Sequence, residues 1–126
     1  MPVIVDTSVW IDYFRDGGNS EKLDFLIDEN LLALNDLILA ELVPFLKIRR
    51  QHQLIDLLSN VRTLPIMIDW QELIALQTAC LKNGLNGIGI PDLIIAQNAK
   101  QHGCAIYSLD RHFLRMRDIL AVEIMV

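Results

Sequence analysis

Short aliphatic runs alternate with longer helical patterns along this chain of 126 residues. Val3–Val5, Leu31–Leu34 and Ala105–Ser108 are apolar at nearly every position. Strands that are buried on both faces have this composition, because helices cover both sides of a parallel sheet. The alternation therefore predicts an α/β fold with a central, mostly parallel sheet.

The segments between these runs repeat their apolar residues at helical spacing. We expect helices over Thr7 to Arg15, Glu21 to Glu29, Asp36 to Arg50, Gln53 to Asn60, Asp69 to Asn83, Pro91 to Gln101 and Arg111 to Asp118. Val61–Met67 is extended and, because Pro65 cannot donate to a sheet, lies at an edge or in a connection. Val122–Met125 is the final strand, and residues 16–20 form a turn before the second helix.

Length and composition limit the class of protein. The chain fits one domain over residues 1–126, and its 52% of hydrophobic residues suits a packed core. A net charge of −5 argues against a surface of broad positive charge for duplex binding. Cys80 and Cys104 lack metal-binding spacing and are expected to be buried thiols. We find no signal peptide and no membrane span, so we expect a cytoplasmic protein without a membrane partner.

Four acidic residues lie in apolar or small-residue surroundings: Asp6, Glu41, Asp92 and Asp110. A carboxylate removed from water costs several kcal/mol unless it is paired or binds a metal. Asp6 and Asp110 follow predicted strands, and ligands of open parallel sheets bind beyond the carboxyl ends of strands. We therefore expect the four to converge there on Mg²⁺ or Mn²⁺, which prefer oxygen ligands.

Each acid also has an ordinary structural explanation. Asp6 and Asp110 are suited to cap the helices that follow them, and Asp92 in a first helical turn favours the helix dipole. Glu41, within an apolar helix, fits capping less well, although a polar stripe with Lys47 remains open for it. The joint pattern, rather than any single acid, favours a functional site.

The order of the motifs resembles that of PIN-domain ribonucleases. The matching blocks are Val3–Ile11, Ile38–Leu42, Ile90–Ala96 and Tyr107–Phe113, and together they extend over nearly the whole chain. In length and order the chain is most similar to the toxins of VapBC-type toxin–antitoxin pairs. The resemblance implies a PIN-like three-layer α/β/α fold and a metal-dependent endoribonuclease.

Carried over block by block, the resemblance makes the four acids the catalytic residues. Asp6, Glu41, Asp92 and Asp110 would hold one or two Mg²⁺ or Mn²⁺ ions, and Ser8 and Ser108 would support the acids or a bound water.

The resemblance also implies partners: an RNA substrate such as tRNA or another structured RNA, a cognate antitoxin that inserts a segment into the acidic pocket, and a second copy in a homodimer. We expect an apolar groove for the antitoxin near Trp10, Phe14, Phe45 and Leu46.

His112 departs from the family pattern. Many relatives have a second acid two positions after the last site aspartate, where this chain has His112. The part of the site around Asp110 would then hold metal less well, and His112 could instead contact substrate phosphate. The nearby cations Arg111, Arg115 and Arg117 could guide RNA, or could form a basic helix face that is merely solvated.

Two other functions fit parts of the sequence. The first is a protein that keeps the fold but only binds RNA or protein, which the change at His112 would favour. The second is a phosphate-handling α/β protein with Asp6 as phosphoacceptor. Against it, the start Val5-Asp6-Thr7-Ser8 lacks the second aspartate that phosphatases of the haloacid dehalogenase type carry two residues on.

Overall fold

The fold is a five-stranded sheet flanked by helices, seen in a computed structural model that describes residues 2–15 and 20–125. The strands are β1 (Val3–Val5), β2 (Leu32–Leu34), β3 (Arg62–Thr63), β4 (Ala105–Tyr107) and β5 (Ile124–Met125). The helices are α1 (Thr7–Phe14), α2 (Ser20–Asp28), α3 (Asp36–Ile48), α4 (His52–Ser59), α5 (Trp70–Lys82), α6 (Ile90–His102) and α7 (Arg111–Leu120). Each expected strand and helix is present within a few residues of its predicted bounds. Residues 16–19 of the expected turn lie outside the described residues.

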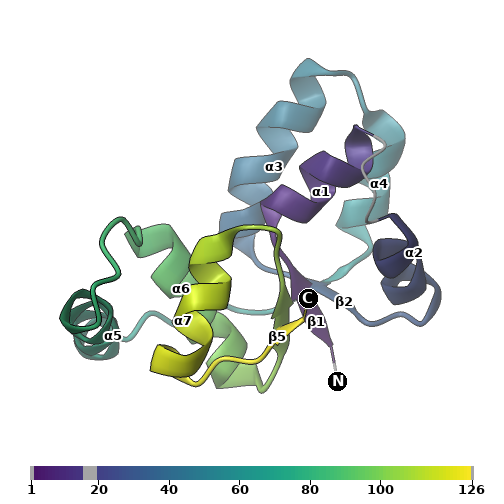
Figure 1. The fold of residues 1–126 in the computed structure, drawn as a ribbon. Helices are drawn as coiled ribbons and strands as arrows, with labels where there is room; N and C mark the ends of the chain where they lie inside the picture. The colour runs from purple at the N-terminus through teal and green to yellow at the C-terminus, as the bar shows by residue number, and fades with distance from the viewer. Residues whose placement is uncertain (1, 16–19, 126) are drawn as a thin grey trace.

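Every strand pair in the sheet is parallel, so the prediction of a mostly parallel sheet is confirmed. The order is β3-β2-β1-β4-β5, and β3 lies at an edge as Pro65 predicted. In Figure 1, α1, α3 and α4 gather on one side of the strands and α5, α6 and α7 on the other. This is the three-layer α/β/α arrangement that the sequence implied.

The strand order reverses between β1 and β4, at the centre of the sheet. The chain moves outward from β1 to β3 and then returns to place β4 on the other side of β1. Val5 pairs with Tyr107, so the residues that leave these two strands lie side by side. Such a switch point is where parallel sheets bind ligands. Here it is occupied by Asp6 and Ser108, and the Asp6 N–H donates to the Tyr107 carbonyl at 2.9 Å.

Local signals fix the helices that approach this edge. The Asn35 side chain caps α3 by accepting from the Ile38 N–H at 2.9 Å. Helix α6 carries Pro91 in its first turn and ends at Gly103, which is left-handed at φ 63°. Proline suits a first helical turn and glycine a left-handed end, so both residues explain where the helix begins and ends.

Buried amides on α6 hold the segment between β3 and α5. Asn98 donates to the Pro65 carbonyl at 2.9 Å and accepts from Asn35 at 3.1 Å. Gln97 donates to the Asp69 carbonyl at 3.0 Å. Buried polar groups need such partners, so these contacts fix α6 against its neighbours and thereby set the position of its first turn. The sequence reasoning did not identify this network.

The predicted antitoxin groove is wrong in two of its four residues. Trp10 and Leu46 are 0% exposed and belong to the core. Their partly buried neighbours Phe14 and Phe45 meet edge to face, with ring centroids 6.1 Å apart. The helical spacing of Trp10 was equally compatible with core and surface, and tertiary packing placed it inside.

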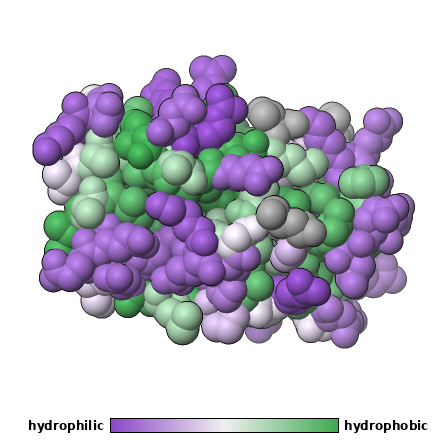
Figure 2. Space-filling view, turned by 90° about the horizontal axis from the view of Figure 1, so that it is seen from below, coloured by the Kyte–Doolittle hydropathy of each residue, from purple (hydrophilic) through white to green (hydrophobic). Residues whose placement is uncertain are grey.

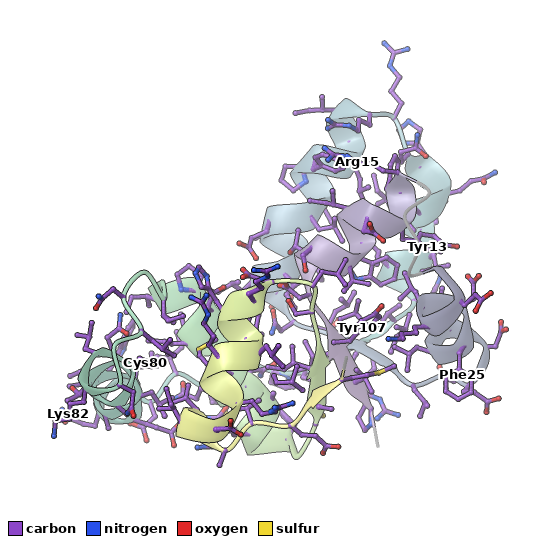
Figure 3. The ribbon with its side chains drawn as sticks, viewed as in Figure 1. Tyr13, Arg15, Phe25, Cys80, Lys82 and Tyr107 are labelled. Carbon is purple, nitrogen blue, oxygen red and sulfur yellow. The ribbon has the colours of Figure 1, made fainter. Side chains whose placement is uncertain are left out.

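The surface mixes hydrophilic side chains with hydrophobic ones, as the face in Figure 2 shows. Figure 3 shows Tyr107 in the middle of the molecule and Phe25 on the outer side of α2. Both cysteines are buried, as predicted. Among the described residues, no helix combines the length and the apolar character needed to cross a bilayer.

Candidate active site

Asp92, Asp110 and His112 form the tightest group of ligand-type side chains among the described residues. One ligand atom from each lies within 4.8 Å of the others, and all three side chains are partly exposed. Asp92 comes from the first turn of α6, whereas Asp110 and His112 come from the start of α7. The fold thus brings together residues that are 18 or more positions apart in the sequence.

Asp6 lies beside this group and is held by two serines. The residue is only 7% exposed, and its Oδ2 accepts hydrogen bonds from Ser8 Oγ and Ser108 Oγ, both at 2.9 Å. Although Asp6 occupies the N-cap position of α1, its side chain makes no capping hydrogen bond. The capping explanation is therefore wrong for Asp6. It holds for Asp110, whose Oδ1 accepts from the His112 N–H at 2.9 Å.

The same two serines tie the chain after β4 to the start of α1. Ser8 Oγ accepts from the Leu109 N–H at 3.1 Å, and Ser108 Oγ accepts from the Asp110 N–H at 3.0 Å. The two hydroxyl oxygens are 3.3 Å apart. Because each hydroxyl donates to Asp6 while accepting from the backbone, the network fixes Asp6 and Asp110 relative to one another.

Glu41 reaches the site from α3 and is more exposed than the other acids. Thr7 Oγ1 donates to Glu41 Oε1 at 3.4 Å. Burial raises the pKa of Glu41, the negative charge of Asp6 raises it further, and the Thr7 hydrogen bond opposes both. Thr7 was not among the predicted site residues, although a hydroxyl directly after Asp6 at a helix start was a signal for it.

The pKa of Asp92 responds to the charges of the other three acids, so all four lie close enough to interact. The pKa of Asp92 is raised from 3.8 to about 6, first by burial and then by the negative charges of Asp110, Asp6 and, more weakly, Glu41. His112 acts in the opposite direction. A carboxyl responds in this way when it is partly removed from water and other acids lie close to it.

Lysine and arginine side chains of the described residues do not balance the negative charge of the four acids. Among residues 2–15 and 20–125, no lysine or arginine forms an ion pair with any of the four acids. The imidazole of His112 is the basic group beside the acids, with its Nδ1 3.5 Å from Asp110 Oδ1. Arg111 and Arg115 are exposed on α7 beside the site.

The donor set fits a divalent cation. Carboxylate oxygens are the ligands that Mg²⁺ and Mn²⁺ prefer, and an ion among them would offset the repulsion that adds to the effect of burial on the pKa of Asp92. Asp92 and Asp110 share one group of ligand atoms within 4.8 Å, and Asp6 and Glu41 lie close enough for their charges to act on Asp92.

We expect Ser8→Ala and Ser108→Ala together to destabilise the protein by more than the sum of the single changes. Either hydroxyl alone can still serve the Asp6 carboxylate, so each single change should cost about 1 kcal/mol and the double change about 3 kcal/mol. Denaturant unfolding of the four proteins measures this. Ser59→Ala, which removes an exposed hydroxyl on α4, is the control and should change stability by less than about 0.5 kcal/mol. Strict additivity of the two site changes would contradict the shared network.

Comparisons with known proteins agree with this architecture. The family model of the PIN domain matches residues 3–119. The structure of VapBC2 from Rickettsia felis bound to a DNA fragment from their promoter has a TM-score of 0.76 and 21% identity, covering 99% of this chain and 98% of that one. The structure of DNA-bound VapBC from Salmonella typhimurium has a TM-score of 0.76 and 16% identity, covering 99% and 97%.

FitAcB from Neisseria gonorrhoeae has a TM-score of 0.72 and 22% identity, covering 98% of this chain and 96% of that one. At these identities the likeness shows a shared fold. No curated protein matches the chain. The family model extends over all four acids and both serines of the site, and this chain belongs to the PIN domain family.

Proposed function

We propose that this protein is a metal-dependent endoribonuclease and the toxin of a toxin–antitoxin pair. The observation that carries the proposal is the convergence of four carboxylates, without a lysine or arginine partner among the described residues, at the switch point of a PIN-domain sheet. A purely structural role does not explain such crowding, because it raises the free energy of the folded state.

In the proposed site, Asp6, Glu41, Asp92 and Asp110 hold one or two Mg²⁺ or Mn²⁺ ions. When bound, the metal supplies a Lewis acid that makes water a stronger nucleophile and neutralises charge on the scissile phosphate. Ser8 and Ser108 keep Asp6 oriented through their hydrogen bonds to its Oδ2. Thr7 orients Glu41 at the more exposed side.

The carboxylates also accept a proton during hydrolysis. Water forms a bond to phosphorus, the bond from phosphorus to the 3′ oxygen breaks, and a site carboxylate takes the proton of the water. The departing 3′ oxygen takes up a proton from solvent. The products are a 5′-phosphate and a 3′-hydroxyl. The substrate is RNA, tRNA or another structured RNA, and the exposed Arg111 and Arg115 contact its phosphates beside the acids.

We assign two protein partners to separate surfaces. The acidic cluster suits an arginine of an antitoxin, because no lysine or arginine among the described residues pairs with it. A groove of about 400 Å³ next to Phe14, lined also by Tyr13, Leu54 and Leu57, suits apolar side chains of the same partner. A second copy would cover Trp70, Ile74 and Ile90, which are 61%, 60% and 44% exposed and form an apolar groove.

Cleavage of labelled tRNA and structured RNA tests the function. Purified protein freed of antitoxin should cut in Mg²⁺ or Mn²⁺, and EDTA or Asp6→Asn should reduce the rate by roughly 10³-fold. Asp56→Asn, an exposed acid on α4 outside the cluster, is the matched control and should keep the rate. Absence of cutting by folded wild type in either metal would reject the proposal in favour of a binding module.

A further inference from the structure

His112 lies where a metal ligand would lie, although it is the one member of the group that is not acidic. Its imidazole shares with Asp92 and Asp110 a set of ligand atoms within 4.8 Å of one another. Two ligands bound to one ion at about 2.1 Å are separated by at most about 4.2 Å. A contraction of a few tenths of an ångström would therefore bring all three atoms onto one ion.

The start of α7 holds His112 and Asp110 as one unit. The His112 N–H donates to Asp110 Oδ1 at 2.9 Å, while the imidazole Nδ1 is 3.5 Å from the same oxygen. The next residue, Phe113, is 1% exposed and anchors the helix in the core. The two side chains remain open to solvent, at 38% and 39% exposure, so an ion can reach them without unfolding the helix.

We propose that His112 supplies a nitrogen ligand to the ion held by Asp92 and Asp110, and that this ligand makes the centre select Mn²⁺ over Mg²⁺. Imidazole binds first-row transition metals well, whereas Mg²⁺ is bound through oxygen. An all-carboxylate site lacks this discrimination. The inference rests on the proposed function, because it assumes that the acidic cluster binds a divalent ion.

As a ligand, His112 would give the site a different metal preference from that of an acid at the same position. An acid at that position would add negative charge beside Asp92 and Asp110, whereas an imidazole adds a nitrogen ligand without negative charge. Replacing His112 by an acid should therefore convert the centre to one that binds Mg²⁺ more readily. Removing the ligand should weaken Mn²⁺ binding far more than Mg²⁺ binding.

Pulsed EPR of Mn²⁺ bound to the full chain tests the ligand directly. Wild type should show coupling between the Mn²⁺ electron spin and a directly bonded ¹⁴N, and His112→Gln should lose it. We expect the Mn²⁺ Kd of His112→Gln to rise about tenfold or more, and the Mg²⁺ Kd to change less than about threefold. His112→Asp should also lose the nitrogen coupling and bind Mg²⁺ more tightly than wild type. His52→Gln, on exposed α4, is the matched control and should keep the coupling and both Kd values.

The outcomes separate this inference from the proposed function. RNA cleavage in Mn²⁺ without nitrogen coupling in wild type would overturn the inference and leave the nuclease assignment standing. Nitrogen coupling lost only in the His112 variants would support the inference even if no RNA is cut. A wild type that binds no Mn²⁺ would overturn both.

Discussion

Asp92→Asn is expected to slow RNA cleavage strongly while making the metal-free protein more stable. The change removes a proposed metal ligand, so cleavage should fall by roughly 10²–10³-fold. It also removes a charge that burial and three neighbouring acids oppose. An activity loss combined with a stability gain distinguishes a functional acid from a structural one, whose removal would cost stability.

The stability gain has a defined pH dependence. The pKa of Asp92 in the folded protein is raised from 3.8 to about 6, so the folded state holds this proton more tightly than the unfolded state. Wild type therefore loses stability relative to Asp92→Asn as pH rises from about 4 through about 6. One pKa unit corresponds to about 1.4 kcal/mol, and solvent screening of this half-buried side chain reduces the gain to about 1–2 kcal/mol at neutral pH.

Urea unfolding in EDTA at pH 4 and pH 7.5 measures this effect. The two proteins should differ little at pH 4, and the variant should be the more stable at pH 7.5. Asp56→Asn is the control, since Asp56 is exposed on α4 outside the cluster. A variant that is less stable than wild type at pH 7.5 would show that Asp92 is a structural residue.

Trp10→Ala is expected to destabilise the protein by about 3–5 kcal/mol, the cost of removing a buried aromatic side chain. Trp10 is 0% exposed and meets Tyr13 edge to face, with centroids 6.5 Å apart. A loss of this size is a large part of the total stability of a small domain, so the melting temperature should fall by roughly 10–20 °C. Its effect on antitoxin binding would thus report unfolding, not contact.

Phe25→Ala is the matched control for thermal unfolding. Phe25 is 54% exposed on the outer side of α2, so its removal should change stability by less than about 0.5 kcal/mol (Figure 3). Equal losses for the two variants would contradict the core position of Trp10. For antitoxin contact, Phe14 and Phe45 are the better positions to change, because both are only partly buried.

Local pattern predicted most of the secondary structure because its signals are short-range. Apolar runs predicted the strands, and 3.6-residue spacing predicted the helices. Pro91 and Gly103 predicted the ends of α6. The same signals could not distinguish two kinds of apolar position. Val9 and Trp10 in α1 and Leu46 in α3 are buried, whereas Trp70 and Ile74 in α5 are exposed. Burial depends on which elements pack together, and periodicity does not encode that.

For the acidic residues, the sequence predicted the candidates and the tertiary structure supplied their contacts. Chain order and apolar surroundings singled out Asp6, Glu41, Asp92 and Asp110 as candidates, because carboxylates in such surroundings need a partner. Only the tertiary structure decided that Ser8 and Ser108 both donate to Asp6, that Thr7 contacts Glu41, and that His112 joins Asp92 and Asp110.

The physical reason is the strand order. A switch between β1 and β4 places residues about 100 positions apart within hydrogen-bonding distance, as in the contact between Ser108 and Asp6. The sequence determined the kinds of group available and the α/β architecture that carries them. The distances, which decide whether a histidine is a departure from a site or a ligand within it, were fixed by packing across the sheet.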